Sequence, residues 1–234
     1  ADITAMGTAQ IAVLSTADIA AMTTAQIAAL GTAQVVALTS ADTAVFSSAQ
    51  AAVLTSAQLN VMETADFATL STGAIRALST DAIANMTTAQ VANLSTAQMV
   101  AMSTAQVAAF TTAEIVALTS ADAAVLTTAQ VAALNSAQVA AIETLDMSAL
   151  STADIRALSA SALAGMTTAQ AHVLSSAQAA ALTSTQTNVF STDQVANLLT
   201  EAVAALSTAA VRALSAADIT AMGTAQIAVL STAD

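Results

Sequence analysis

Residues that could do chemistry are few and scattered in this sequence. His172 is the only histidine, and a catalytic or metal-binding role would require partner side chains that the sequence does not supply. Serine and threonine are abundant, but there is no nucleophile elbow, and a serine hydroxyl without a positioned histidine is a weak nucleophile. We therefore predict no catalytic residue, no cofactor-binding residue, no metal ligand and no enzymatic activity.

The acidic residues form the one arrangement with chemical content. Ten of the 15 stand at the same position of a short repeat, for example Asp18, Asp42, Asp66, Glu114 and Asp154. If repeats stack, these carboxylates could line a stripe of oxygen ligands for a hard cation such as Ca²⁺. Glutamines interrupt the stripe and no glycine-bearing calcium loop occurs, so cation binding is kept only as an alternative.

Composition and charge exclude several partners. The chain is 56% hydrophobic and 2% aromatic, without Trp, Tyr, Pro or Cys, which predicts thin, repeated packing instead of one deep core. The net charge of -12, with three arginines and no lysine, disfavours nucleic acid and anionic membranes as partners. Because polar residues interrupt every apolar run, we expect no membrane span.

An eight-residue repeat runs through the whole chain. Leu, Met, Phe or Ile recurs at every eighth residue from Met6 to Leu230, at 29 positions without a slip. Written to end on that residue, the consensus octad is [S/T]-[S/T]-A-[Q/D]-[I/V]-A-[A/V]-[L/M], numbered here as positions one to eight. The departures from this consensus are scattered, which argues against an assembled site: Asp81, Leu145, His172, Leu199 and Glu201.

A longer period lies above the octad. Residues 217–234 repeat residues 1–18 letter for letter, which defines a 216-residue higher-order repeat. Arginine-bearing octads at 71–78, 151–158 and 207–214 open blocks of 10, 7 and 10 octads when the sequence is read cyclically. We expect a single continuous array over residues 1–234 that is a window of a longer chain.

Each octad predicts one short helix. A continuous helix cannot keep a period of eight on one face, because eight residues overshoot two turns by about 80°. In a strand, positions five and eight would point to opposite faces. Position one is Ser, Thr, Gly or Asn in 26 of 29 octads, and position four completes a capping box. We expect helices of about seven residues joined by one-residue corners.

The variation among octads predicts which positions are buried. Positions five and eight form the large apolar face, whereas position six holds Arg76, Arg156, His172 and Arg212 and should face solvent. The alanine-rich positions three, six and seven would let adjacent helices approach closely. Position two is Ser or Thr in 27 of 29 octads, so its hydroxyl either is the cap itself or bonds to the next coil.

These patterns predict an all-α fold, an α-solenoid of two-turn helices with one helix per octad. Blocks of 10 and 7 octads differ by three, which favours a 24-residue coil made of three octads. Two or four octads per coil stay open as alternatives.

The octads TTAQIAAL (23–30) and TTAQVAAL (127–134) resemble those of very long, octapeptide-repeat bacterial proteins that are secreted or attached to the cell surface. The resemblance implies an extracellular or cell-surface location and a structural or adhesive role. The leading hypothesis is a filament- or stalk-forming protein whose partner is itself or the continuation of the same chain. The alternative is a surface-binding module that engages cations, glycans or ice through a regular Thr or acidic ladder.

Overall fold

A computed structural model describes residues 3–230 of the chain, and regular structure in that range is helical throughout. The predicted all-α solenoid is confirmed. The chain divides into two compact units, residues 1–117 and 118–234, which are described separately below. The expectation of one continuous array over residues 1–234 stays a prediction.

The first unit begins with a 3₁₀ turn, and one short α-helix then occupies each octad. These elements are η1 (Ile3–Ala5), α1 (Thr8–Ile11), α2 (Thr16–Ala21), α3 (Thr24–Ala28), α4 (Thr32–Val36), α5 (Ser40–Ala44), α6 (Ser48–Ala51), α7 (Ser56–Val61), α8 (Thr64–Ala68), α9 (Thr72–Ala77), α10 (Thr80–Ile83), α11 (Thr88–Ala92), α12 (Thr96–Ala101), α13 (Thr104–Ala108) and α14 (Thr112–Val116).

The second unit repeats the same plan. Its helices are α15 (Ser120–Val125), α16 (Thr128–Ala132), α17 (Ser136–Ala141), α18 (Thr144–Ala149), α19 (Thr152–Ala157), α20 (Ala160–Leu163), α21 (Thr168–His172), α22 (Ser176–Ala181), α23 (Ser184–Thr187), α24 (Thr192–Asn197), α25 (Thr200–Ala205), α26 (Thr208–Val211), α27 (Ala216–Ala221) and α28 (Thr224–Ala228).

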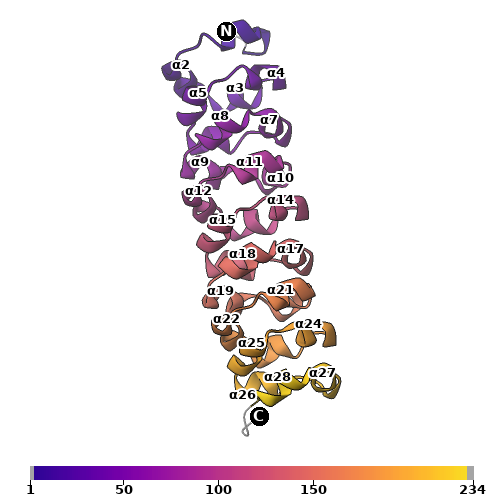
Figure 1. The fold of residues 1–234 in the computed structure, drawn as a ribbon. Helices are drawn as coiled ribbons and strands as arrows, with labels where there is room; N and C mark the ends of the chain where they lie inside the picture. The colour runs from indigo at the N-terminus through magenta and orange to yellow at the C-terminus, as the bar shows by residue number, and fades with distance from the viewer. Residues whose placement is uncertain (1–2, 231–234) are drawn as a thin grey trace. The chain divides into compact units, whose positions relative to one another are not determined.

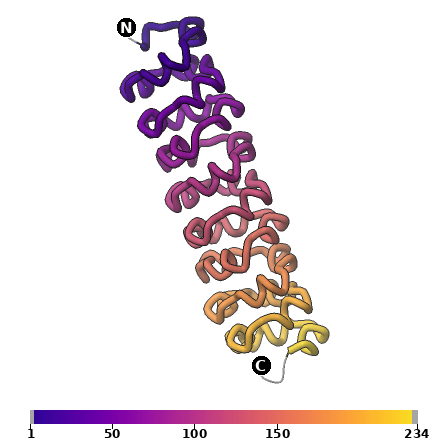
Figure 2. Tube along the Cα trace, turned by 90° about the vertical axis from the view of Figure 1, so that its left-hand side faces the viewer, coloured from indigo at the N-terminus to yellow at the C-terminus, as the bar shows by residue number. Residues whose placement is uncertain are grey.

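Within each unit, every helix packs on the helix three octads away. In the first unit α4 lies between α1 and α7, and in the second α18 lies between α15 and α21. Figure 1 shows these helices in successive layers within each unit, and Figure 2 follows the chain as it winds from layer to layer. Three octads therefore make one coil, as the block lengths favoured.

The helices are shorter than expected and the corners are longer. The α-helices contain four to six residues, and two to four residues connect one helix to the next. At the corner between α2 and α3, both Met22 (φ -61°, ψ 137°) and Thr23 (φ -71°, ψ 159°) are extended. The predicted seven-residue helix with a one-residue corner is wrong, because position eight leaves the helix to turn the chain.

Positions four, five and eight of the octad are buried in the interior of each unit in most octads. The position-five side chains of Ile19, Ile27 and Phe67 have no exposed surface. The four basic residues at position six are all exposed, as predicted. The expectation that positions three and six bring helices together is wrong, because the face that carries them is turned to solvent.

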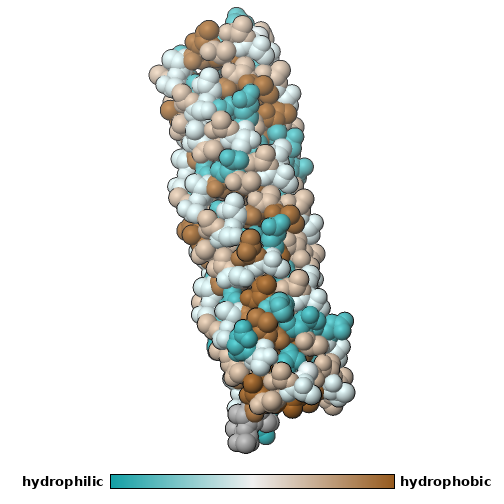
Figure 3. Space-filling view, in the orientation of Figure 1, coloured by the Kyte–Doolittle hydropathy of each residue, from teal (hydrophilic) through white to brown (hydrophobic). Residues whose placement is uncertain are grey.

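The outer surface mixes small apolar and hydroxyl side chains. On the face that Figure 3 shows, apolar residues form separate small patches among polar ones. Of the helices described in the two units, none is both long enough and apolar enough to cross a membrane.

Candidate functional site

Position one is the N-cap residue of the α-helices, as the sequence predicts, and its side chain accepts a capping hydrogen bond in most of them. At the start of α3, the Thr23 hydroxyl accepts a hydrogen bond from the Gln26 N–H at 3.3 Å. In return, the Thr23 N–H donates to Gln26 Oε1 at 2.8 Å. This reciprocal pair is a capping box, and it satisfies two main-chain donors that a helix start leaves without partners.

The position-four glutamines also bond to the preceding coil. The Gln50 amide Nε2 donates to the carbonyl oxygens of Ile19 and Met22, each at 2.9 Å. Gln58 repeats this pattern on Ile27 and Leu30, again 31 and 28 residues earlier. We call these glutamines the glutamine seam: Gln34, Gln50, Gln58, Gln90, Gln98 and Gln106 in the first unit, and Gln170, Gln178, Gln186, Gln194 and Gln226 in the second.

The seam explains why position four is buried and why glutamine is common there. A capping box needs only an acceptor, which Asp or Glu would provide equally well. The position-eight carbonyls of the preceding coil, and the position-five carbonyls that already accept the position-eight N–H, can each accept a further donor, and only the amide offers an acceptor and a donor together. The excess of glutamine over carboxylates at position four was the available signal, but the sequence alone does not show which carbonyls lie opposite.

Carboxylates at position four use a different partner. Asp66 Oδ1 accepts a hydrogen bond from the Ser40 hydroxyl at 2.6 Å, and Asp146 Oδ1 accepts one from Ser120 at 2.7 Å. Both serines are position-two residues of the preceding coil, and the cap itself belongs to position one. Of the two predicted roles for the position-two hydroxyl, these serines therefore take the one that joins successive coils.

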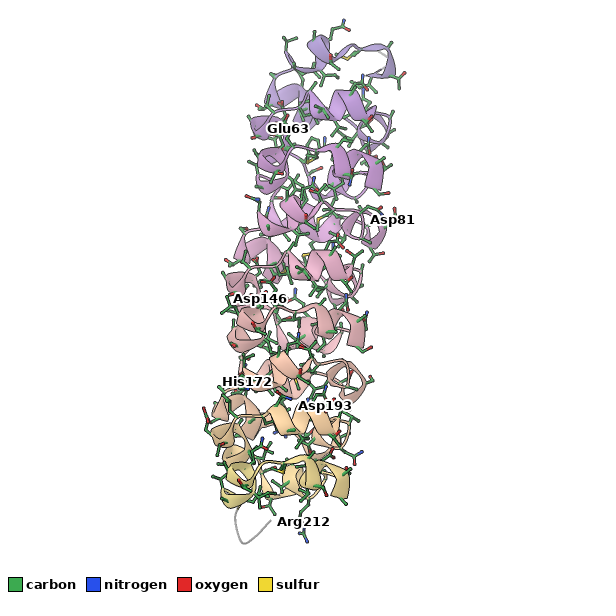
Figure 4. All side chains as sticks on the ribbon, turned by 45° about the vertical axis from the view of Figure 1, so that its right-hand side comes forward. Glu63, Asp81, Asp146, His172, Asp193 and Arg212 are labelled. Atoms are coloured by element: carbon green, nitrogen blue, oxygen red, sulfur yellow. The ribbon has the colours of Figure 1, made fainter. Side chains whose placement is uncertain are left out.

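The acidic residues do not gather into a cation site. Within residues 3–230, no group of three or more His, Cys, Asp or Glu side chains is placed to hold a metal ion. Figure 4 shows Glu63 and Asp81 in different coils of the first unit, and Asp146, His172, Asp193 and Arg212 in different octads of the second. The carboxylates at position four act in capping and in coil-to-coil hydrogen bonds.

Side chains at position six reach the end of a helix in the next coil. His172 Nδ1 lies 3.1 Å from the Asn197 carbonyl oxygen, and Asn60 Nδ2 donates to the Asn85 carbonyl at 2.9 Å. Both acceptors lie 25 residues later in the chain. Because the last carbonyls of a helix lack partners within it, polar and cationic groups are favourable there.

His172 also lines an open groove in the second unit. Asn197, Thr200, Gly223 and Gln226 contribute to the same groove, which holds no second titratable side chain among the described residues. A single imidazole with no acid, base or nucleophile beside it does not form a catalytic constellation.

Two buried carboxylates have an oxygen atom without a hydrogen-bond partner in the described part of the chain, Glu114 Oε1 and Asp146 Oδ2. Burial raises the pKa of Glu114, and hydrogen bonds from Thr111 oppose this shift only in part. Burial also raises the pKa of Asp146, with the charges of Glu143 and Asp122 adding to it and the Ser120 bond opposing it. Exposed Asp18 has a lowered pKa because the Ser15 hydroxyl and N–H bond to its carboxylate.

The remaining departures from the repeat stay apart. Leu145 is exposed on α18, and Leu199 begins α25 without a side-chain cap. Asp81 is exposed on α10 and accepts a hydrogen bond from Ser56. Glu201 is exposed on α25. These residues bring no reactive groups together.

Comparison with known families agrees with this repeated architecture. Matches to the ALTTAQ repeat cover residues 1–32, 11–47, 59–96, 91–120, 139–175 and 195–232, well over half of the chain. The chain belongs to the ALTTAQ repeat family. No curated protein and no solved structure matches it. The resemblance to octapeptide-repeat proteins is thus confirmed at the level of the repeat, and each ALTTAQ repeat corresponds here to capped helices joined by the glutamine seam.

Proposed function

We propose that this ALTTAQ repeat chain is a structural, non-enzymatic protein that forms a filament or stalk outside the cell. The observation that carries the proposal is the register of the glutamine seam, in which nine of the eleven amides meet the two carbonyls 31 and 28 residues earlier, as Gln50 and Gln178 do. Coils joined in this way can be added without altering those already present, as in other solenoids.

The recurrence of residues 1–18 at 217–234 supports the same role. A second 216-residue unit would present the same side chains at the same register to the coil before it. We propose the continuation of the chain, or another copy of it, as the partner that such a structure requires.

Small-angle X-ray scattering can test this proposal on the 234-residue chain and on a chain lengthened by one 216-residue unit. A stalk should lengthen by one helix-packing distance, roughly 8–10 Å, for every three octads added. The cross-section should stay constant. A maximum dimension that grows only as the cube root of chain length would contradict the proposal.

A second candidate role, binding to glycans, ice or another surface, rests on the exposed hydroxyls of position two. Within the described part of the chain, Thr24, Thr32 and Thr104 are exposed and make no hydrogen bond through their side chains. Replacing exposed position-two threonines by alanine leaves every position-one cap in place, so lost binding to a glycan array or to ice could be assigned to the hydroxyls. If the unsubstituted chain shows no binding above background, this role is excluded.

A further inference from the structure

Glu114 occupies a place in the first unit where the repeat elsewhere carries a seam glutamine. Its Oε2 accepts the Thr111 N–H at 2.6 Å, as a glutamine Oε1 does in the capping box. Its Oε1 is buried without a hydrogen-bond partner among the described residues, and the residue is only 1% exposed. Glu114 therefore keeps the acceptor function of a seam glutamine in the capping box but lacks its donor function toward the preceding coil.

The register of the seam identifies what lies opposite that oxygen. Gln106, one octad earlier, donates to the carbonyls of Ile75 and Leu78, both at 2.8 Å. The corresponding carbonyls for Glu114, at the same separations of 31 and 28 residues, belong to Ile83 and Met86. An ionised carboxylate can only accept hydrogen bonds, so it cannot pair with a carbonyl oxygen, whereas a protonated carboxyl can donate its O–H.

We propose that Glu114 is a proton-binding joint between coils: its neutral carboxyl donates a hydrogen bond to the main-chain carbonyl of Ile83 or Met86, and ionisation breaks this bond. The proton is exchanged with solvent, and no other group is changed. Protonated Glu114 thus acts as a seam glutamine, and ionised Glu114 leaves a buried negative charge beside carbonyl oxygens.

The surroundings of Glu114 within the first unit contain little else that titrates. Helix α11, which packs on α14, has the sequence TAQVA and no ionisable side chain. Helices α13 and α14 contribute no second one. Asp81 on α10 is exposed and bonded to Ser56. Burial has the largest effect on the pKa of Glu114 and raises it, whereas the hydrogen bonds from Thr111 and a smaller effect of the Met86 main chain lower it.

The direction of the pH effect follows from proton linkage. Because the folded state holds the Glu114 proton more tightly than the unfolded state, the stability that this proton brings is fully present below the ordinary glutamate pKa of 4.5. It is lost as the pH rises from there through the folded-state pKa. For each pKa unit by which the folded-state value of Glu114 exceeds the unfolded-state value, the folding equilibrium constant falls about tenfold between low and high pH.

The proposal can be tested on the full chain labelled with ¹³C at the glutamate carboxyl carbons. The chain has only four glutamates, Glu63, Glu114, Glu143 and Glu201, so the signal that E114Q removes can be assigned directly. We expect that signal to titrate above pH 4.5. Titration at or below 4.5 would overturn the proposal.

Denaturant unfolding between pH 4 and pH 8 provides the second measurement. E114Q should match the parent chain near pH 4 and become progressively more stable than it as the pH rises. Q106E should show the opposite trend, because it places a second carboxyl on the seam, and E201Q controls for the loss of one exposed charge. An E114Q effect of equal size at every pH, or a Q106E variant with no pH-dependent loss, would also overturn the proposal.

Discussion

A glutamine side chain carries an acceptor and two donors on one planar group, and this chain uses both ends. At Gln58, Oε1 accepts the Thr55 N–H at 2.8 Å while Nε2 donates to two carbonyls of the preceding coil. The same residue therefore starts a helix and fixes its place in the stack. The sequence predicts the first role from the capping box alone, whereas the second depends on carbonyl groups that are distant in the sequence.

At the residue scale, we predict that Q58L destabilises the first unit far more than Q26L. Both changes remove the same capping acceptor, but among the described residues Gln26 makes no hydrogen bond to another coil, whereas Gln58 donates to two buried carbonyls of the preceding coil. We expect a loss of about 2–4 kcal/mol for Q58L and about 1 kcal/mol for Q26L, measured by urea unfolding. Equal losses would show that the inter-coil amide bonds contribute no net stability.

At the element scale, each helix is too short to be stable by itself, and its ends therefore matter as much as its middle. The sequence correctly predicts where each helix starts, because caps are read from neighbouring residues. It does not predict where each helix ends, because the end depends on contacts with another coil. Position eight is extended, and the carbonyls of positions five and eight accept hydrogen bonds from a distant glutamine, as those of Ile19 and Met22 do from Gln50. Local signals were sufficient for helix starts, and tertiary contacts decided the corners.

A glycine cap offers a test of the helix start. Gly31 begins α4 with φ -72° and ψ 158°, a conformation that serine adopts freely, and a Cβ there would lie 3.7 Å from Gln34 Oε1. G31S should therefore gain a hydroxyl cap and a few tenths of a kcal/mol in unfolding free energy. Thermal unfolding followed by circular dichroism measures the change, and the accompanying G31A variant separates the hydroxyl from the effect of the methyl group. A G31S variant no more stable than G31A would contradict the capping account.

A close approach between main chains of successive coils at Gly165, in the second unit, gives a prediction of opposite sign. A Cβ at Gly165, just after α20, would lie 2.2 Å from the Ser136 carbonyl oxygen of the preceding coil. We expect G165A to cost about 1–3 kcal/mol, because main-chain atoms must move to admit the methyl group. G73A is the control, since its Cβ would meet side-chain atoms alone: the Ser48 hydroxyl at 3.0 Å, which can rotate away, and the Ser71 hydroxyl at 3.8 Å, an ordinary contact. Equal stability of G165A and the parent chain would show that the coils can separate at little cost.

At the scale of the whole molecule, one coil of three octads is the smallest piece that can be removed while every remaining helix still stacks on the helix three octads away. Deleting residues 143–166 removes α18, α19 and α20 and brings α21, α22 and α23 onto α15, α16 and α17. Gln170, Gln178 and Gln186, which already belong to the glutamine seam, then take the position-four places of Asp146, Asp154 and Ala162, so the deleted coil carries no seam glutamine. We expect this shortened chain to keep the helicity per residue and the melting temperature of the parent chain.

Deleting only residues 143–154 should behave differently. It joins position eight of one octad to position five of another. The Ser151 cap and the position-four residues Asp146 and Asp154 are lost, and the stretch that follows has no helix start. Circular dichroism should then show less helix per residue and a lower melting temperature than the whole-coil deletion, although fewer residues are missing. Because composition is almost the same in both deletions, the comparison isolates register, and equal behaviour would mean that the stack depends on hydrophobic content and not on the octad.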